Sequence, residues 1–364
     1  MQDPNNSFPF DIRDVEGTDD KELSKYFLGA GNFSIQVGPK KYLLMSDYKH
    51  DAENIYNMRL RYDDIFVVTY PRSGTTWTQE LVWLLASDLD YSTAEKIPLS
   101  SRSIFLEQVI VSLPISVRNI SLMLQLPRFP MLMHKNIVEH LDKEHADKPE
   151  NLKNLQLMRT PGSEQVARIP SPRFIRTHLP LSLLPPTLLD TTKVVYVARD
   201  PRDVAVSYYY LSSEFKSYNF NGDFKSYWRL FVKDLVYWSP FFEHLKEAWQ
   251  MRHHPNLLFL FYEELLQNLP ATVQRVADFL GKEYKADQIA ELCTHLKFEN
   301  FKKNPSVGID NLKEYGMMAP KGEFIRKGKS GGWRDYFDEE MTREAQLWID
   351  NNLQDTDMRF PSMQ

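Results

Sequence analysis

One short segment of the sequence joins a cation to a run of small polar residues. It lies between an apolar run at 65–70 and an amphipathic pattern, and it consists of Arg72, Ser73, Gly74, Thr75 and Thr76. Main-chain amides exposed between a buried strand and a helix form a site for an anion at the positive end of the helix. The segment predicts a phosphate site, against the alternative of an ordinary tight turn. It lacks the Gly-x4-Gly-Lys-Ser/Thr pattern of the Walker loop.

A histidine follows a second apolar run. The run at 173–177 predicts a strand, and His178 comes directly after it. Doubly wound sheets bind ligands at the carboxyl ends of their strands, and an imidazole that titrates near neutral pH can accept a proton from a hydroxyl group. His178 is therefore a candidate general base, although a single histidine is more often structural. Arg176 adds a cation to the same edge.

Two further segments place cations near small residues. In the first, a predicted strand at 193–198 delivers Arg199 to its carboxyl end, and the helix that follows carries Ser207 two turns on. In the second, Arg326 precedes Gly328 in a basic, glycine-rich stretch. Guanidinium groups and main-chain amides suit a phosphate. Taken alone, the first segment is typical of a solvated helix start and the second of a flexible surface loop.

Short apolar strands and the helical patterns that follow them must position these groups. Strands are predicted at 65–70, 173–177, 193–198 and 257–262. Their near-continuous hydrophobicity is typical of strands covered on both faces, so we expect a doubly wound α/β fold, a central parallel sheet flanked by helices on both faces. Helices are predicted at 77–85, 240–250, 271–280 and 286–296, and Gly281 is placed to end the third.

Length and composition fit one large globular domain. The chain has 364 residues, a formal net charge of −5 and a pI near 6.0, which argues against a broad nucleic-acid surface. A single cysteine, a polar N-terminus without a signal sequence and no apolar run near roughly 18 residues predict a soluble, cytoplasmic protein without a membrane span. No metal site is predicted, because His253 and His254 are typical of a solvated turn.

We expect a single domain over residues 1–364, with an N-terminal extension at 1–50. An inserted, lid-like segment is expected at about 91–172, because this stretch is long and rich in Leu, Met and Pro. It contains the apolar patch 122–133 and is expected to pack over a site. The alternative is an additional helical layer without a functional role.

Four segments resemble, in the same order, the motifs of the cytosolic sulfotransferases, which use 3′-phosphoadenosine 5′-phosphosulfate (PAPS). Residues 69–77, TYPRSGTTW, are similar to the family's 5′-phosphosulfate loop TYPKSGTTW, with Arg72 in place of lysine. Residues 176–180, RTHLP, are similar to its KTHLP segment. Residues 194–209 resemble its 3′-phosphate segment, and residues 326–333, RKGKSGGW, resemble its RKGxxGxW signature.

The resemblance covers about residues 66–333 and implies the P-loop-like sulfotransferase fold. It also implies PAPS as co-substrate and PAP as product, without a metal. His178 is implied as the general base, and Arg72 and Arg176 are implied to compensate charge on the sulfuryl group and the leaving phosphate. Arg72 keeps the charge of the family's lysine but offers a planar fork.

The nucleotide-binding residues are implied by the same resemblance. They are Arg72, Ser73, Gly74, Thr75, Thr76, Trp77, Arg199, Ser207, Tyr262, Phe298, Phe324, Arg326, Lys327 and Gly328. Arg199 and Ser207 match the residues that bind the 3′-phosphate, and the aromatic residues match those around the adenine, since aromatic faces favour planar bases. Leu296 stands where the family has a threonine beside the adenine.

The implied activity is sulfuryl transfer to a hydroxyl of a small lipophilic acceptor of the phenol, steroid or retinoid type. The residues expected to line its pocket are Phe105, 122–133, 208–210, Tyr237 and Trp238. One alternative is a P-loop kinase, which the absent Walker pattern disfavours. Another is a non-catalytic nucleotide- or lipophile-binding protein. A third is a retinol dehydratase-like enzyme that forms a transient sulfate ester and eliminates it.

The extra length of the chain bears on the last alternative. Together with the segments 52–58 and 333–341, it is similar to retinol dehydratase-like members of the superfamily. Pro71 stands where such a dehydratase is expected to have glutamine, so net sulfation is favoured. The family's KxxxTVxxxE dimer motif is not present after Trp333, so a monomer and a homodimer both stay open.

Overall fold

A parallel sheet lies at the centre of the molecule. The computed structural model describes residues 7–28, 34–107, 160–308, 310–314 and 317–362. In these residues the sheet has the order β5-β6-β4-β7-β8, with β4 Ile65–Thr69, β5 Ile104–Phe105, β6 Phe174–Thr177, β7 Lys193–Ala198 and β8 Leu257–Phe261. The four predicted strands are confirmed. β5 was not predicted, because two residues are too few to show a period.

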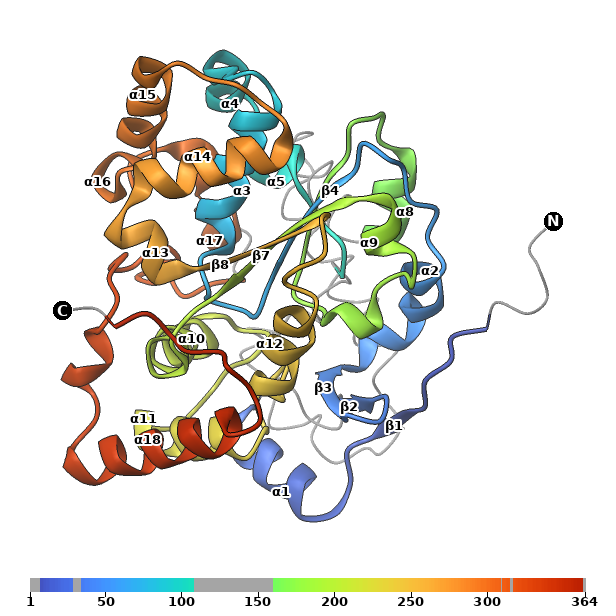
Figure 1. Cartoon of the computed structure of the whole chain (residues 1–364). Helices are drawn as coiled ribbons and strands as arrows, with labels where there is room; N and C mark the ends of the chain where they lie inside the picture. The colour runs from blue at the N-terminus through green and yellow to red at the C-terminus, as the bar shows by residue number, and fades with distance from the viewer. Residues whose placement is uncertain (1–6, 29–33, 108–159, 309, 315–316, 363–364) are drawn as a thin grey trace.

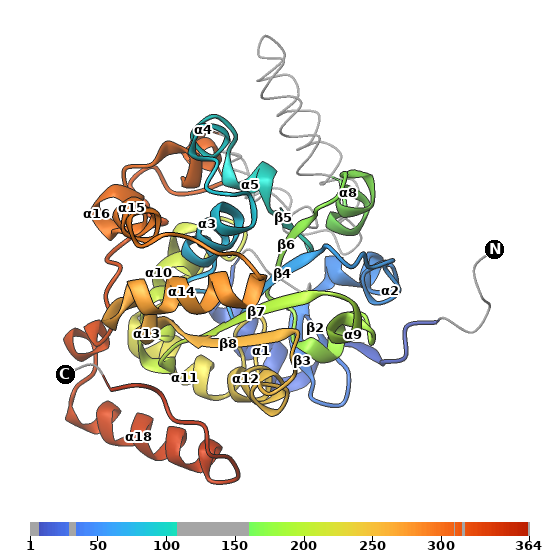
Figure 2. The ribbon, with the colours of Figure 1, turned by 45° about the horizontal axis from the view of Figure 1, so that its top comes forward.

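Helices cover both faces of the sheet, as predicted (Figure 1). Successive strand residues point to opposite faces, so Val67 and Val195 pack in one core cluster and Val68 and Tyr196 in the other. The first cluster lies under α3 Thr75–Ala86, α14 Leu269–Leu280 and α15 Ala286–Leu296. The second lies under α10 Pro201–Glu214, α11 Phe224–Val232, α12 Phe241–Gln250 and α18 Glu339–Leu353. Figure 2 shows the two helical layers on either side of the sheet.

A small antiparallel sheet precedes the central one. It pairs β1 Ile12–Asp14, β2 Ser34–Val37 and β3 Tyr42–Met45 in sequence order. The amide and carbonyl of Leu43 bond the main chain at Ser239 and Trp238, at 2.8 and 2.7 Å. Buried side chains of β2 and β3 join the core of the central sheet. The amino-terminal residues therefore brace the segment that leads into α12.

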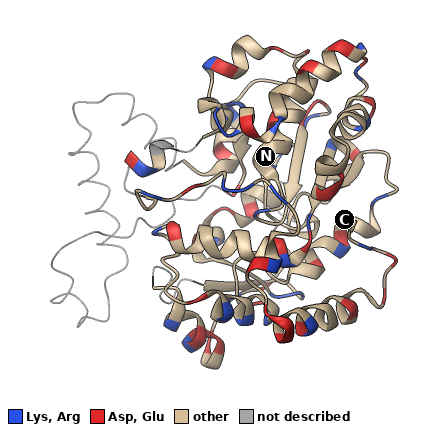
Figure 3. Ribbon diagram, turned by 90° about the vertical axis from the view of Figure 1, so that its left-hand side faces the viewer, with Lys and Arg blue, Asp and Glu red and all other residues tan. Residues whose placement is uncertain are grey.

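Short elements complete the described ranges. They are α1 Gly17–Tyr26, η1 Ser46–His50, α2 Ala52–Tyr56, α4 Tyr91–Lys96, α5 Leu99–Arg102, α8 Gly162–Arg168, η3 Leu181–Leu183, α9 Leu188–Thr191, α13 Tyr262–Gln267, α16 Phe298–Phe301, η4 Pro305–Val307, α17 Asp310–Glu314 and η5 Gly332–Asp335. None of these helices, nor the longer ones above, has the length and apolar character to cross a membrane. On the face in Figure 3, acidic and basic residues are interspersed over the helices.

The predicted division of the chain stays a prediction. It comprises one domain over 1–364, an extension at 1–50 and an insertion at about 91–172. The apolar patch 122–133 lies outside the described residues. In its described parts, the insertion contributes α4, α5, β5 and α8, and β5 extends the central sheet beside β6.

Candidate active site

The carboxyl ends of three adjacent strands meet where the chain changes direction across the sheet. From β4 the chain runs to β5 and β6 on one side and then crosses to β7 on the other. In open α/β sheets, ligands bind at such a switch point. The loop 70–74 follows β4, His178 follows β6 and Arg199 follows β7. The fold therefore brings together the base and the anion-binding residues that were predicted from separate segments.

The loop after β4 is shaped for a bound anion. Gly74 has φ of 102° and caps α3, and a Cβ there would lie 2.6 Å from the ring of Tyr262. Only glycine fits this left-handed, crowded position. The amides of the first turn of α3 carry the positive end of a 12-residue helix. The hydroxyl of Ser73 is buried without a hydrogen-bond partner among the described residues. Buried hydroxyl groups normally have a partner, so this one is available to bind a ligand.

Arg72 ties the loop to two distant segments. Its Nε donates to Oγ of Ser207 at 3.0 Å, and its Nη2 donates to the carbonyl of Phe324 at 2.9 Å. Burial, together with the positive charges of Arg199 and Arg326, lowers the pKa of Arg72 to about 10. The guanidinium is still charged at neutral pH. Clustered like charges of this kind favour a multivalent anion between them.

Three more guanidinium groups have unused donors. Nε of Arg176, of Arg199 and of Arg326 is buried without a partner among the described residues. The fork of Arg199 spans the carbonyls of Arg72 and Lys329, at 2.9 and 2.8 Å, and lies over the ring of Tyr262. Arg326 lies over the ring of Tyr210. Buried donors are normally paired, so these orphaned groups fit the oxygens of an anionic ligand that carries phosphate or sulfate groups.

Aromatic side chains lie beside the anion site. The rings of Trp77 and Tyr262 are 5.7 Å apart, and the indole of Trp77 donates to the carbonyl of Leu296 at 2.9 Å. Gly328, with φ of 59°, packs directly on the ring of Phe298, because a Cβ at Gly328 would lie 2.0 Å from it. The arrangement leaves aromatic surface suited to a purine.

Gly328→Ala should weaken PAP binding. The added methyl group must displace Phe298 or the loop 326–329, which costs about 1–3 kcal/mol of folding stability and moves the ring that is expected to contact the adenine. Calorimetric titration with PAP measures the change. Gly281→Ala is the matched control, because Gly281 also has positive φ but has no atom within 4 Å of the added Cβ. Equal affinities for the two variants would contradict the assigned role of Gly328.

His178 is held as a neutral base. Its Nδ1 lies 2.8 Å from the carbonyl oxygen of Thr69, and because a carbonyl only accepts, Nδ1 carries the proton and Nε2 keeps its lone pair. Burial lowers the pKa of His178 to about 3, against a smaller opposing effect of the bond to Thr69. A lowered pKa keeps the imidazole neutral at every pH above about 3. Phe105 and Trp238 flank it, with ring centroids at 5.4 and 5.6 Å.

Two residues beside His178 were missed by the sequence reasoning. Glu107 accepts a hydrogen bond from the amide of His178, and Nε2 of His244 lies 2.9 Å from the His178 carbonyl. Glu107 follows β5, the strand that was too short to predict. His244 lies within the predicted helix at 240–250. It follows Phe241 by three positions, and this helical spacing was the one sequence signal that His244 faces the core.

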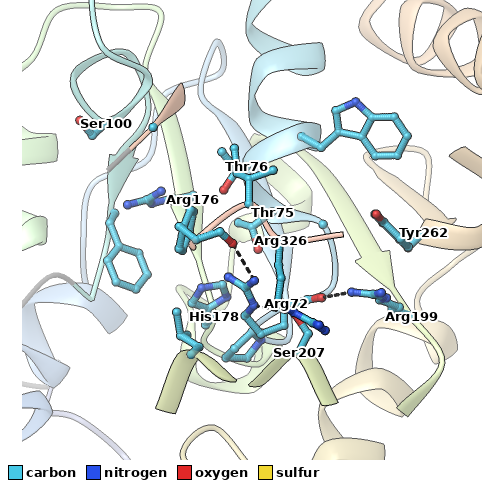
Figure 4. A pocket seen from close by; sticks show the side chains of 18 of the residues that line it. Arg72, Thr75, Thr76, Ser100, Arg176, His178, Arg199, Ser207, Tyr262 and Arg326 are labelled. Carbon is cyan, nitrogen blue, oxygen red and sulfur yellow. Dashed lines mark hydrogen bonds between the residues drawn. The ribbon is translucent and has the colours of Figure 1, made fainter. Parts of the chain in front are cut away.

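One cavity of about 1520 Å³ connects these groups (Figure 4). Its wall includes His178, Arg176 and every implied nucleotide-binding residue except the fully buried Ser73. Beside His178 the wall includes the rings of Phe105 and Trp238. Of the other residues expected to line an acceptor pocket, Tyr208 and Tyr237 are instead buried in the core, and Tyr209 and Tyr210 pack against that core. Residues 122–133 lie outside the described residues.

The fold and the site together define the class of protein, an α/β enzyme that binds an anionic nucleotide beside a neutral imidazole. The chain belongs to the sulfotransferase family, because the family described as "Sulfotransferase domain" matches residues 62–357. It is 29% identical to luciferin sulfotransferase of Photinus pyralis over 88% of this chain and 80% of that protein. It is 28% identical to sulfotransferase 1B1 of Canis lupus familiaris, over 88% and 93%.

Among solved structures, retinol dehydratase is a close match. Its complex with androsterone and the inactive cofactor PAP is 44% identical, covers 98% of this chain and 99% of that one, and has a TM-score of 0.85. Its complex with retinol and PAP gives a TM-score of 0.84 at the same identity. The predicted family, the P-loop-like sulfotransferase fold and the PAPS-dependent sulfotransferase activity are confirmed. The role of each site residue stays a prediction.

Proposed function

We propose that this sulfotransferase acts on a hydroxyl group of a lipophilic alcohol, with His178 as the base. The observation that carries the proposal is the fixed tautomer of His178: Nδ1 is bound to Thr69, which leaves Nε2 as an acceptor in the wall of the cavity. The apolar residues Phe105 and Trp238 beside it suit a lipophilic acceptor.

Other residues around the cavity would bind the nucleotide and compensate charge during the transfer. PAPS, when bound, supplies a sulfuryl group already activated by its bond to phosphate. Arg199 and Ser207 would hold the 3′-phosphate, and the loop 72–76 with the first turn of α3 would hold the 5′ end. Arg72 and Arg176 compensate negative charge near His178, and both keep their charge because their lowered pKa values are still about 10. His178 takes the proton of the acceptor hydroxyl.

The first candidate outcome is net sulfation. The acceptor oxygen gains the sulfuryl group, PAP leaves and one proton is released. A second candidate, elimination of the sulfate ester, is favoured by the 44% identity and TM-score of 0.85 to retinol dehydratase. In that case the ester gives an alkene, inorganic sulfate and a proton. Both outcomes begin with the same transfer, so the same cradle, the loops after β4, β6 and β7, and the same base, His178, would serve in either case.

Mass analysis of products separates the two candidates. With PAPS and retinol, net sulfation gives a stable sulfate ester, whereas elimination gives a desulfated alkene with free sulfate. Androsterone is the comparison acceptor, because a saturated steroid alcohol has no allylic system to assist elimination and should end as its sulfate ester. If neither acceptor, nor a panel of phenols, takes label from PAPS, the proposal of a lipophilic alcohol acceptor is wrong.

We also propose a cytoplasmic location, which the single, unpaired Cys293 supports. The assembly state, monomer or homodimer, is a question for light scattering of the purified chain. We propose further that residues 1–364 form a single domain and that the insertion at about 91–172 acts as a lid.

A further inference from the structure

A half-buried carboxylate in the wall of the cavity lies beside the proposed base. Oε2 of Glu107 accepts a hydrogen bond from the hydroxyl of Thr177 at 2.6 Å, and Oε1 accepts one from the amide of His178. The hydroxyl of Thr177 in turn accepts the amide of Leu179 at 3.0 Å. One side chain from the insertion therefore binds the turn 177–179, which carries His178 away from β6.

The main chain of His178 is held from both sides. Glu107 binds its amide, and His244 donates from Nε2 to its carbonyl at 2.9 Å, because a carbonyl oxygen only accepts. Nδ1 of His244 lies 2.7 Å from the hydroxyl of Tyr196, which anchors His244 to β7. With Thr69 fixing the imidazole ring, the position of the base is set by contacts to three neighbouring elements.

Folding alone does not explain an acid at position 107. Burial raises the pKa of Glu107 to about 7, even though the bonds from Thr177 and His178 lower it. A buried carboxyl group that must ionise lowers stability, and a glutamine could accept the amide bond without that cost. A glutamine has only one acceptor oxygen, whereas the carboxylate of a glutamate has two and can accept both hydrogen bonds.

We propose that Glu107 is a positioning residue for the transfer, an inference that rests on the proposed role of His178. Its carboxylate binds the Thr177 hydroxyl and the His178 amide together, which fixes the turn from which the imidazole reaches the cavity. The base is thereby held in line with the acceptor hydroxyl. Glu107 itself does not transfer the proton.

The surroundings of Glu107 define a pH test. Among the described residues, the charged or titratable groups that interact with it are Arg176 and His178 from β6 and the turn that follows, Tyr48 from η1, and Tyr218. His178 is already neutral above a pH of about 3. A fall in kcat as the pH drops through about 7 would therefore report protonation of Glu107. Above pH 7, Glu107 is ionised and accepts the hydrogen bonds from both Thr177 and His178.

The experiment compares the full-length wild type, Glu107→Gln and Glu107→Ala. We expect Glu107→Gln to lower kcat at alkaline pH by about 10- to 100-fold, the scale of a small misplacement of a catalytic group, and to remove the acid limb of kcat across about pH 5.5 to 9. The alanine variant should lose more. The Kd for PAP and the KM for PAPS should stay close to the wild-type values, because Glu107 does not contact the nucleotide loops.

Glu263→Gln is the matched control. Glu263 is fully buried, and burial likewise raises its pKa to about 7. It also accepts one amide, from Asp200 at 3.1 Å, and one hydroxyl, from Ser330 at 3.2 Å. It lies outside the turn 177–179, so its glutamine variant should keep the acid limb. A wild-type pH profile in Glu107→Gln would overturn the inference.

Stability separates positioning from a structural role. A carboxyl group with a folded-state pKa near 7, above its ordinary 4.5, favours the protonated folded state, so its ionisation lowers stability as the pH rises through 7. Glu107→Gln should therefore unfold at an equal or higher temperature than the wild type at alkaline pH. A lower unfolding temperature together with lost turnover would contradict positioning. If His178→Ala stays active, the proposed base itself is wrong; if only Glu107→Gln behaves as wild type, the error lies with this inference.

Discussion

His178→Ala should lose most turnover while it retains PAP binding. A positioned general base contributes typically about 10²- to 10⁴-fold to a rate, and nothing else in the wall near Phe105 and Trp238 offers a neutral imidazole in the described residues. In the described residues, the imidazole reaches the nucleotide loop only indirectly, because Nδ1 bonds Thr69 and the Thr69 hydroxyl lies 2.7 Å from that of Thr75. Transfer of labelled sulfate gives kcat, and calorimetry gives the Kd for PAP.

His253→Ala is the control for this variant. His253 is exposed and lies in the turn after α12, so its loss should change neither quantity. Transfer by His178→Ala at the wild-type rate would remove His178 from the mechanism. Loss of PAP binding along with turnover would instead assign His178 to the architecture of the cradle.

Arg199→Ala should give the largest loss of nucleotide affinity. Its guanidinium is buried, with two donors bound to the carbonyls of Arg72 and Lys329 and with Nε free among the described residues. Truncating one partner of a buried, hydrogen-bonded charge pair costs about 2–5 kcal/mol, roughly 30- to 4000-fold in Kd for PAP. Titration calorimetry at fixed ionic strength measures it.

A conservative variant and a control variant accompany Arg199→Ala. Arg199→Lys should bind PAP with intermediate affinity, because lysine keeps the charge and loses the fork. Arg252→Ala is the matched control, since Arg252 also lies over an aromatic ring, Trp249, but pairs with Asp357 away from the cavity. An affinity of Arg199→Ala within about threefold of the wild type, well under 1 kcal/mol, would contradict the 3′-phosphate assignment.

The central sheet was predictable because its strands are buried on both faces. Continuous apolar runs at 65–70 and 193–198 have no polar side to mask the signal, and the structure pairs them as neighbouring strands. The site loops were predictable for a related reason. Small residues, glycine and arginine directly after such strands must lie at the carboxyl edge, where the fold places Arg72 and Arg199 in contact.

The contacts behind the base could not be predicted from local patterns. β5 has only two residues, Ile104 and Phe105, so no sequence pattern placed Glu107, two positions after the strand, near the sheet edge. His244 is one residue on a helix that buries most of one face, and its partner in the turn after β6 is 66 positions away. Tyr208 and Tyr237 were assigned to a pocket, yet they pack in the aromatic core, because aromatic residues give no sequence signal that separates the two environments.

The cradle of loops after β4, β6 and β7 is the central claim, and titration of the wild-type chain with PAP tests it most directly. We expect one molecule of PAP to bind per chain, with an affinity that falls only weakly as salt rises, because salt screens buried arginines little and these carry much of the contact. Well-folded protein that shows no heat of binding at any accessible concentration would contradict the account.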